Sequence, residues 1–319
     1  MFRNAEVLVA GGTGFVGANL INRLLTLGAN VRATLYRKDA VIIDKRIEYV
    51  KCNLLNMDDC KKVVDGMDYV FLCAANTSGA AVIASTPLVH VTPNIIMNSQ
   101  MLEAAYFAKV KKFIWLSSNA AYPPSDDRYV KEEEMFNGDP YDIYFGVAWM
   151  KRYTEILCRM YSTKLKNPMP TVVVRPSNIY GPYDDFDFAT SHMMAATIRK
   201  IIERQNPINV WGNGDDVRDL IYIDDFIEAL ILSAEKIETY EPVNIAYGKG
   251  YSVKEIINMC LEVEGFKNAV VTYDSSKPSM IPIRLINAEK AAKLLGFKIK
   301  TDVKTGIKKT MEWYKKYYK

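Results

Sequence analysis

The sequence predicts an α/β protein with a doubly wound parallel sheet and a smaller, mostly helical C-terminal lobe. Three observations lead to this fold class. Short apolar runs alternate with helical patterns over residues 1–180, a glycine-rich turn follows the first run, and the alternation stops after Pro176. With 319 residues, the chain is long enough for one large domain or two interlocked ones.

Five runs in the first part of the chain predict strands. Each is rich in Val, Ile or Phe and nearly continuous in apolarity, as expected where helices cover both faces of a parallel sheet. The runs are EVLVA at 6–10, NVRATLY at 30–36, YVFLCAA at 69–75, KFIWLSS at 112–118 and TVVVRP at 171–176. Apolar residues at helical spacing predict helices between them, at 17–28, 57–66, 95–109 and 144–161.

The character of the chain changes after Pro176. The stretch SNIYGPYDDFDF is rich in Pro, Gly and Asp and predicts a loop, and most of the segments behind it have helical patterns. A further core strand is expected at VNIAYG, residues 243–248. We therefore expect one domain to contain residues 1–176 and about 210–245, and residues 177–319 to form mainly the smaller lobe.

Composition argues against several kinds of protein. The 41 basic and 37 acidic residues are mixed along the chain, and a net charge of +4 leaves no basic block of the kind that binds nucleic acid. No stretch approaches the roughly 18 uninterrupted apolar residues of a membrane span. Five scattered cysteines and two histidines favour neither a disulfide framework nor a metal site. We therefore expect no metal and a reducing, cytoplasmic location.

The turn GGTGFVG directly follows the first predicted strand and precedes a helix. Gly11, Gly14 and Gly17 have GxxGxxG spacing, and glycine allows both a tight turn and a close approach of the backbone to a pyrophosphate. The helix N-terminus, with Phe15 and Val16 in its first turn, offers unpaired N–H groups and a positive dipole end to that anion. Three glycines alone are a weak signal, but strand, turn and helix together predict a Rossmann-type dinucleotide site.

Several motifs together resemble one enzyme family. GxxGxxG, LSSNAAYP, Lys151, RPSNIYGP and VRDLIYIDDF match, in order and spacing, the extended short-chain dehydrogenase/reductases of the epimerase/dehydratase family, which act on nucleotide sugars. The resemblance covers almost the whole chain. Within the family, NIIMNSQMLEAA, SHMMAA and VWGNGDDVRDLIYIDDF are most similar to the GDP-fucose synthases, which are GDP-sugar epimerase-reductases. The resemblance implies a nicotinamide cofactor and a nucleotide-sugar substrate.

The resemblance also assigns residues to the cofactor. An acidic residue normally ends the second strand and selects NAD, but Leu35 stands there, followed by Tyr36 and Arg37. Arg37 either faces the 2′-phosphate of NADP or is a solvated surface charge. We expect NAD, because an oxidative reaction is favoured, and leave NADP open. The other implied contacts are Asn53 and Leu54 at the adenine, Ala74 and Ala75 beside the nicotinamide, and the buttressing Asn94.

The helix predicted at 144–161 raises the main chemical question. The family carries a Tyr-x-x-x-Lys pair on one helix face, followed four residues later by Glu. The lysine binds the nicotinamide ribose and lowers the pKa of the tyrosine, which exchanges a proton with a sugar hydroxyl. Glu155 sets the register, so Lys151 is the lysine and Val147 replaces the tyrosine. Tyr144 lies one turn earlier, and it either takes over as acid/base or only packs.

Ser118 matches the catalytic Ser/Thr of the family, which hydrogen-bonds the reacting oxygen. Sugar 4,6-dehydratases carry Asp-Glu behind it, where this chain has Asn119 and Ala120, and epimerase-reductases carry a cysteine at Ala120. His192 matches a second epimerase acid/base, but without that cysteine we expect it to contact substrate or to pack. The resemblance therefore implies neither water elimination nor 3,5-epimerisation, which leaves hydride transfer at one carbon, C4.

The resemblance implies substrate-binding residues as well. Asn178 follows a core strand, where relatives hydrogen-bond the sugar diphosphate, and Arg218 and Arg284 match arginines that contact the diphosphate or the nucleotide ribose. Two guanidiniums suit a pyrophosphate because they form planar, bidentate hydrogen bonds. Each arginine alone is also explained as a surface ion-pair partner, and Asn287 replaces the Asp that follows in relatives. Trp211 either stacks on the base or belongs to the core.

Together these features predict a cytoplasmic NAD(P)-dependent oxidoreductase that acts at C4 of a nucleotide sugar, a GDP-linked hexose or heptose, for surface polysaccharide synthesis. A nucleotide-sugar 4-epimerase and a cofactor-binding protein with degenerate catalysis are the alternatives. The first domain would hold the cofactor and the lobe mainly the substrate, with no nucleic-acid or membrane partner. We expect a homo-oligomer, a dimer or a tetramer, because family members pair through helices equivalent to 90–108 and 144–161.

Overall fold

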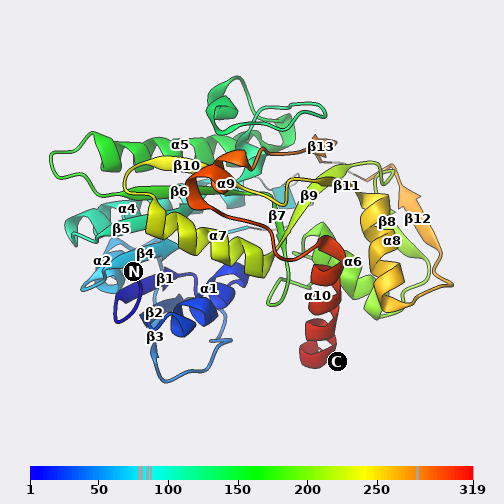
Figure 1. Cartoon of the computed structure of the whole chain (residues 1–319), viewed down its shortest axis with the longest axis horizontal. Helices are drawn as coiled ribbons and strands as arrows, with labels where there is room; N and C mark the ends of the chain where they lie inside the picture. Colours follow the sequence, from blue (N-terminus) through cyan, green and yellow to red (C-terminus); the bar gives the residue numbers. More distant parts are fainter. Residues whose placement is uncertain (78–81, 84–85, 87, 278–279, 319) are drawn as a thin grey trace.

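A seven-stranded parallel sheet forms the centre of the protein (Figure 1). The computed structural model describes residues 1–77, 82–83, 86, 88–277 and 280–318. The strands are β1 (Glu6–Ala10), β2 (Asn30–Leu35), β3 (Ile47–Lys51), β4 (Tyr69–Leu72), β5 (Lys112–Leu116), β6 (Thr171–Pro176) and β10 (Glu241–Ile245). Their order, β10-β6-β5-β4-β1-β2-β3, confirms the doubly wound sheet predicted from the sequence.

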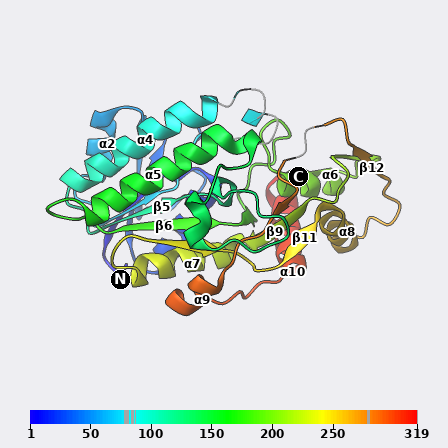
Figure 2. The ribbon, with the colours of Figure 1, turned by 90° about the horizontal axis from the view of Figure 1, so that it is seen from above.

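Helices cover both faces of this sheet (Figures 1 and 2). One face carries α1 (Phe15–Thr26) and α7 (Ile223–Lys236), and the other carries α2 (Met57–Val64), α4 (Leu88–Phe107) and α5 (Phe145–Thr163). Strand β1 shows why the strands are apolar throughout. Val7 and Val9 belong to the core cluster shared with α1 and α7, whereas Leu8 and Ala10 belong to the cluster shared with α2, α4 and α5.

Strand β3 is not predicted by the sequence analysis. It lies at the edge of the sheet and pairs only with β2 within the part of the chain that the structure describes. Glu48 and Lys51 are exposed and the other positions are half-buried. An edge strand of this kind lacks the continuous apolar run that reveals the central strands.

A smaller region of mixed α and β structure follows β6. Its helices are α6 (Met193–Ile202), α8 (Val253–Glu264) and α10 (Val303–Tyr318). In one small sheet, β9 (Val217–Tyr222) pairs with β7 (Asn178–Tyr180), β11 (Gly250–Ser252) and β13 (Ile283–Arg284). In the other, β8 (Ile208–Trp211) pairs with β12 (Val271–Asp274). The region thus holds more strands than the sequence predicts, because most of them are too short to show a period.

The chain returns to the main sheet from this smaller region. Helix α7 packs against α1, and β10 adds a strand beside β6 that overlaps the first three residues of the stretch VNIAYG, where a core strand is predicted. The neighbouring strands β8 and β9 belong to the small sheets, so only part of residues 210–245 lies on the main sheet. Within the described residues, no helix combines the length and the apolar character needed to cross a membrane.

Candidate active site

The glycine turn lies between β1 and α1, at the carboxyl edge of the sheet. Gly11 has a φ of +90°, and a Cβ there would lie 2.6 Å from the backbone nitrogen of Ala74. A Cβ on Gly17 would lie 2.1 Å from the carbonyl oxygen of Gly11. Thr34 fixes the turn, because its Oγ1 accepts a hydrogen bond of 2.8 Å from the Gly11 N–H and its carbonyl one of 3.0 Å from Gly12. The turn therefore has the close packing that a dinucleotide-binding turn requires.

The first turn of α1 is suited to an anion. Gly14 is its N-cap residue, has no side chain to cap the helix, and no acidic residue lies in the first turn. The first N–H groups of the helix, including those of Phe15 and Val16, therefore have no capping side chain, and the positive end of the helix dipole adds to their effect. These features fit the pyrophosphate of a dinucleotide.

The segment after β4 carries Ala74 and Ala75, and two buried side chains of α4 hold the backbone next to them. The Asn94 amide accepts a 2.8 Å hydrogen bond from the Asn76 N–H and donates one of 3.0 Å to the Asn76 carbonyl. His90 Nδ1 donates to the same carbonyl at 3.0 Å. The contacts suit the buttressing role expected of Asn94 and add His90, which the sequence analysis did not single out. Its position four residues before Asn94, on the same helix face, was the available signal.

The end of β2 presents two exposed residues. Tyr36 and Arg37 follow Leu35, and the Arg37 guanidinium lies 5.1 Å from the centre of the Tyr36 ring. No ion pair of Arg37 is found among the described residues. Leu35 provides no carboxylate for the ribose diol of NAD, and the guanidinium of Arg37 follows two residues later.

Asn53 and Leu54 lie in the turn between β3 and α2. The Asn53 side-chain oxygen accepts a 3.1 Å hydrogen bond from the Leu55 N–H, and its own N–H donates to Asp59 at 2.7 Å. Leu54 is buried in the core beneath α2. Asn53 therefore shapes the turn, and Leu54 anchors it.

Lys151 on α5 reaches back to the end of β5. Its Nζ donates a 2.7 Å hydrogen bond to the Leu116 carbonyl and lies 4.7 Å from the centre of the Trp115 ring. Burial lowers the pKa of Lys151 to about 8, although the charge of Glu155 opposes this shift. Val147, one turn earlier, is half-buried and has no group that could transfer a proton.

Ser118 follows β5 and caps the short helix η1 (Asn119–Ala121). Its Oγ accepts a 3.1 Å hydrogen bond from the Ala120 N–H, which leaves the hydroxyl proton available to donate. Because β1, β4 and β5 are parallel, their carboxyl ends meet at one edge of the sheet. Gly11, Ala74 and Ser118 therefore share the edge at which ligands bind in doubly wound proteins.

A buried ion pair that the sequence analysis missed joins α5 to the main sheet. Arg175 on β6 binds both carboxylate oxygens of Glu155, at 2.5 and 3.0 Å, and neither side chain is more than 1% exposed. The Ser117 hydroxyl donates to Glu155 at 2.5 Å, and Arg175 also donates to the Tyr122 hydroxyl at 2.8 Å. Glu155 is thus a structural anchor of α5 against β5 and β6, not a ligand contact.

The two predicted substrate arginines lie side by side. Arg218 and Arg284 are direct partners in the register of the parallel strands β9 and β13. Arg218 forms an ion pair with Asp216 at 3.0 Å. Arg284 is only 2% exposed, and its two terminal nitrogens donate to the backbone carbonyls of Pro123 and Tyr122.

Arg284 lacks a counter-charge within the described residues. No ion pair involves it there, and its Nε is buried without a hydrogen-bond partner. Burial lowers the pKa of Arg284 to about 10, and the neighbouring charge of Arg218 acts in the same direction. A buried guanidinium without a carboxylate is costly, and an anionic ligand would reduce that cost.

Tyr144 lies with these arginines. It ends the short helix η3 (Asp142–Tyr144) and is the N-cap residue of α5, so the helix predicted from residue 144 begins one residue later, at Phe145. Burial raises the pKa of Tyr144, and the charges of Arg218 and Arg284 partly offset that effect. Burial lowers the pKa of Lys151, by contrast, and the charge of Glu155 opposes that shift. The charged groups that act on Tyr144 are thus the two arginines and Asp216.

The remaining predicted substrate residues are spread over the smaller region. Asn178 begins β7 and pairs with Leu220 on β9, two residues from Arg218. His192 is the exposed N-cap residue of α6. Trp211 ends β8 in the other small sheet. Its side chain is 46% exposed, so the ring is not part of the buried core.

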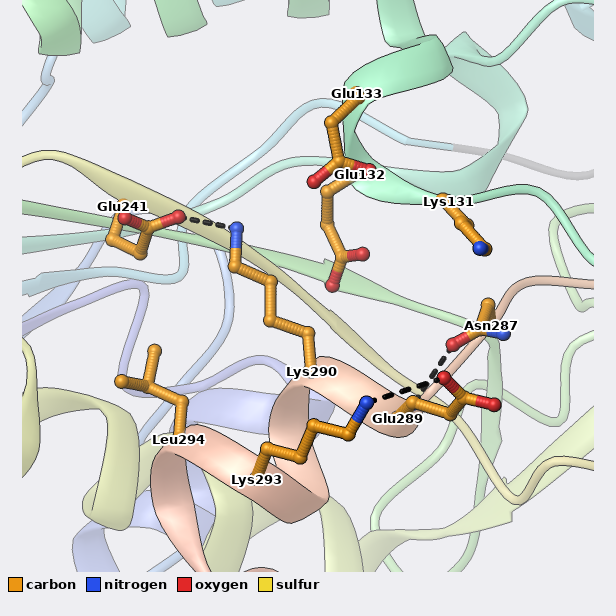
Figure 3. A pocket seen from close by; sticks show the side chains of 9 residues that line it. All are labelled: Lys131, Glu132, Glu133, Glu241, Asn287, Glu289, Lys290, Lys293 and Leu294. Carbon is orange, nitrogen blue, oxygen red and sulfur yellow. Dashed lines mark hydrogen bonds and ion pairs between the residues drawn. The ribbon is translucent and has the colours of Figure 1, made fainter.

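A charged pocket of about 530 Å³ lies apart from the predicted site residues (Figure 3). It is bordered by η2 (Glu132–Phe136), β10 and α9 (Glu289–Leu295). Its charges largely satisfy one another, because Lys290 pairs with Glu241 and Lys293 lies 3.6 Å from Glu289. No group of three His, Cys, Asp or Glu able to hold a metal occurs among the described residues.

The doubly wound sheet, the glycine turn at its carboxyl edge and Lys151 at the end of β5 are the features of an extended short-chain dehydrogenase/reductase. The chain belongs to the NAD dependent epimerase/dehydratase family, which matches residues 7–246. The resemblance stated from the motifs is thereby confirmed, and proteins of this family use NAD or NADP and modify nucleotide sugars.

Individual relatives are similar over nearly the full length. The probable GDP-L-fucose synthase 1 of Oryza sativa subsp. japonica is 27% identical over 321 residues, which cover 98% of this chain and 92% of the relative. The UDP-glucose 4-epimerase of Thermotoga maritima, solved with UDP-glucose, superposes with a TM-score of 0.88 at 25% identity, covering 98% and 100% of the two chains. A GDP-6-OMe-4-keto-L-xylo-heptose reductase from C. jejuni superposes with a TM-score of 0.86 at 24% identity, covering 99% of each chain.

Proposed function

We propose that this protein is a nicotinamide-dependent oxidoreductase that transfers hydride at C4 of a nucleotide sugar, a GDP-linked hexose or heptose used for surface polysaccharides. The observation that carries the proposal is the pair Arg218 and Arg284. One guanidinium of this pair is buried without a counter-charge among the described residues, next to the other. A diphosphate supplies the missing negative charge in a planar, bidentate form.

The relatives support the choice of base and carbon. The Oryza sativa relative is named for a GDP-sugar, and the C. jejuni structure is named a reductase of a GDP-linked 4-keto-heptose. The absence of the dehydratase and epimerase-reductase groups at Asn119 and Ala120 is consistent with a simple hydride transfer.

Different residues of the chain would bind the cofactor and assist the reaction at the sugar. Gly11, Gly17 and the N-terminus of α1 would hold the pyrophosphate of the dinucleotide, whose nicotinamide would supply or accept the hydride. Lys151 offers an ammonium group for the ribose hydroxyls, and Ser118 donates a hydrogen bond to the reacting sugar oxygen. With Val147 in place of the usual tyrosine, the proton passes through Ser118, solvent or Tyr144.

The end of β2 supports NADP over the NAD favoured by the sequence analysis. Leu35 offers no carboxylate there, and the guanidinium of Arg37 has no ion-pair partner in the described part of the chain. A 2′-phosphate would find a cation at this position. Binding of both cofactors to wild type and to Arg37→Ala decides the choice, since only the NADP affinity should fall if Arg37 contacts the phosphate.

Substitution of Arg284 tests the proposed substrate. Arg284→Met should weaken binding of GDP-sugars at least tenfold, because about 1.5–3 kcal/mol of charge-assisted hydrogen bonding is lost. Cofactor affinity should be unchanged. Calorimetric titration with a panel of GDP-, UDP-, CDP- and dTDP-sugars measures both, and Arg46→Met is the matched surface control. Unaltered affinity for every sugar nucleotide would assign Arg284 to the fold alone.

A nucleotide-sugar 4-epimerase is the second candidate, favoured by the similarity to the Thermotoga maritima epimerase. It predicts conversion of one sugar nucleotide into its C4 epimer without net consumption of cofactor. Absorbance of the reduced nicotinamide, followed together with the sugar products, separates the two reactions, because only the oxidoreductase changes the absorbance as it turns over. If sugar nucleotides are neither converted nor able to change that absorbance, the loss at Val147 has made the chain a cofactor-binding protein.

We also propose a cytoplasmic homodimer. Phe145, Trp149, Tyr153 and Ile156 are exposed on one face of α5, and Ile96 is exposed on the adjacent α4. An apolar stripe of this kind is typical of an interface between subunits. Light scattering of wild type and Trp149→Glu tests the dimer. The five free cysteines agree with a reducing compartment.

A further inference from the structure

The loop at residues 181–192 connects the two halves of the candidate site. It follows β7, which begins with Asn178, and leads to α6, which begins after His192. Asn19 on α1 donates hydrogen bonds of 2.9 Å both to the Pro182 carbonyl and to the Phe15 carbonyl in the first turn of the cofactor helix. The loop therefore extends from the cofactor helix to the predicted substrate residues.

The C-terminal helix α10 holds the strand before this loop. The Tyr180 hydroxyl, at the end of β7, donates a 2.9 Å hydrogen bond to the Val303 carbonyl. A Cβ on Gly306 would lie 2.1 Å from the same hydroxyl oxygen, so α10 packs directly against Tyr180. This contact fixes the start of α10 beside the start of the loop.

The end of α10 packs onto the middle of the loop through aromatic rings. Phe186 is 2% exposed and its ring centre lies 4.8 Å from that of Tyr314 and 6.2 Å from that of Trp313, with which it stacks. Tyr183 lies 4.9 Å from Trp313. Rings in such contacts add stabilisation beyond the area that they bury.

The same cluster also reaches the helix that follows the loop. Arg199 on α6 donates a 2.9 Å hydrogen bond to the Phe186 carbonyl and pairs with Glu203 at 2.8 Å. The Tyr314 hydroxyl donates to Glu203 at 3.2 Å. Helix α10 is thus bonded to the element before the loop, to the loop and to the element after it.

Tyr183 shows that the loop conformation depends on outside contacts. Its φ is +66°, in the left-handed region that a residue with a bulky side chain rarely adopts. Such a conformation persists only where surrounding contacts determine it. The ring of Trp313 is one of those contacts.

We propose that the aromatic end of α10 is a clamp that positions the 181–192 loop, and with it His192, for the nucleotide sugar. The proposal rests on the proposed function for the identity of the ligand. Loss of the clamp would leave the chain folded, because the main sheet lies outside it, but the loop would populate other conformations and bind substrate less well.

Amide hydrogen exchange tests the clamp without any ligand. Trp313→Ala should speed exchange at residues 181–192 at least tenfold, with unchanged exchange in β1, β4 and β5. Trp313→Phe should restore slow exchange, since it keeps an aromatic ring. Tyr317→Ala is the matched control, because this ring is 58% exposed and its nearest ring contact is with Trp313, not with the loop. Unchanged exchange in Trp313→Ala overturns the clamp.

Kinetics then test its effect on the site. For Trp313→Ala, KM for the nucleotide sugar should rise at least tenfold while the dissociation constant of the cofactor stays within twofold of wild type, and Trp313→Phe should be close to wild type. Faster loop exchange with an unchanged KM would refute the positioning role. If wild type binds no nucleotide sugar, the proposed function fails, whereas the exchange result still decides whether the clamp exists.

Discussion

The cofactor side and the substrate side of the candidate site are built in opposite ways. On the cofactor side, Gly11, Gly14 and Gly17 come from one short stretch, and the packing of that stretch on itself defines the turn. On the substrate side, Tyr144, Arg218 and Arg284 come from three distant segments that only the small sheet and η3 bring together. A single added side-chain atom should therefore disturb the cofactor turn. On the substrate side, ligand binding should instead depend on the charges of the side chains and on the packing that holds the three segments together.

Substitutions in the glycine turn should produce the largest effects. In Gly17→Ala the new Cβ would press on the carbonyl oxygen of Gly11, which is backbone and cannot move aside. We expect cofactor affinity to fall about 100-fold, or ~2.7 kcal/mol. Gly14→Ala is the control, because its Cβ would lie 3.4 Å from the same oxygen, in ordinary contact. Gly14→Asp should abolish binding by placing a carboxylate against the pyrophosphate.

Calorimetric titration with NAD and NADP measures these affinities, and circular dichroism shows that each variant is folded. Equal affinity in Gly17→Ala and wild type would mean that the turn does not bind the dinucleotide, and the contrast between the two sides would be lost.

Substitution of Tyr144 sharpens the contrast on the substrate side. Tyr144→Phe removes one hydroxyl beside two guanidiniums, so we expect KM for the nucleotide sugar to rise about tenfold, the usual result of losing a hydrogen bond to a charged group. The value of kcat should change less than twofold. A fall in kcat at constant KM would instead make Tyr144 the acid/base.

Val147→Tyr is the companion variant, because it returns a phenol to the position one turn before Lys151. It should transfer hydride at least as fast as wild type, since a placed acid/base commonly contributes about 10²–10⁴-fold. Single-turnover absorbance of the reduced nicotinamide measures it, and slower transfer would show that the site has been rebuilt around valine.

The pH dependence of cofactor binding probes Lys151. Its pKa is lowered to about 8 by burial, so the ammonium that would bind the ribose is lost as pH rises through 8. Cofactor affinity should therefore fall severalfold between about pH 7 and pH 9 in wild type and stay constant in Lys151→Arg, which remains charged. Fluorescence titration across this range measures it, and a flat wild-type profile would remove Lys151 from the cofactor site.

Asp184, in the 181–192 loop, should produce the smallest effect. Burial raises its pKa from 3.8 to about 7 in the fold, so the folded state binds more protons than the unfolded chain between these values. The free energy of unfolding should then decrease as pH rises from about 4 to 7, and Asp184→Asn should remove this decrease. At pH 8 the variant should be more stable by less than about 1 kcal/mol, since the side chain is partly solvated.

Urea denaturation at pH 5 and pH 8 compares the two proteins. Asp58→Asn, at an exposed position on α2, is the control. A variant that keeps the wild-type pH slope would show that Asp184 is not buried against the loop in solution.

The sequence allowed the sheet and the cofactor turn to be predicted because both have local signatures. A parallel strand covered on both faces must be apolar at every position, as Val7, Leu8 and Val9 show, and a turn that admits no Cβ must contain glycine. Strand β3 and the short strands of the smaller region escaped prediction, since half-buried or two-residue strands leave no such pattern.

The register of Lys151 and Glu155 was also readable from the sequence, because helical spacing places both on one face of α5. Nothing local revealed that Glu155 binds Arg175, since the two residues are 20 positions apart and their contact exists only once α5 packs on β6. The role of His90 could not be predicted for the same reason, because its hydrogen bond to Asn76 depends on how α4 packs against the end of β4.

The sequence by itself determined the doubly wound sheet, the glycine turn and the absence of a phenol at Val147, since each follows from side-chain size and spacing along a few residues. Only the tertiary structure decided that Arg284 lies beside Arg218, that the start of α5 brings Tyr144 close to them, and that α10 packs on the 181–192 loop. Those arrangements depend on strand register, burial and ring packing between segments far apart in the chain, and no local pattern encodes which of many possible partners a residue will meet.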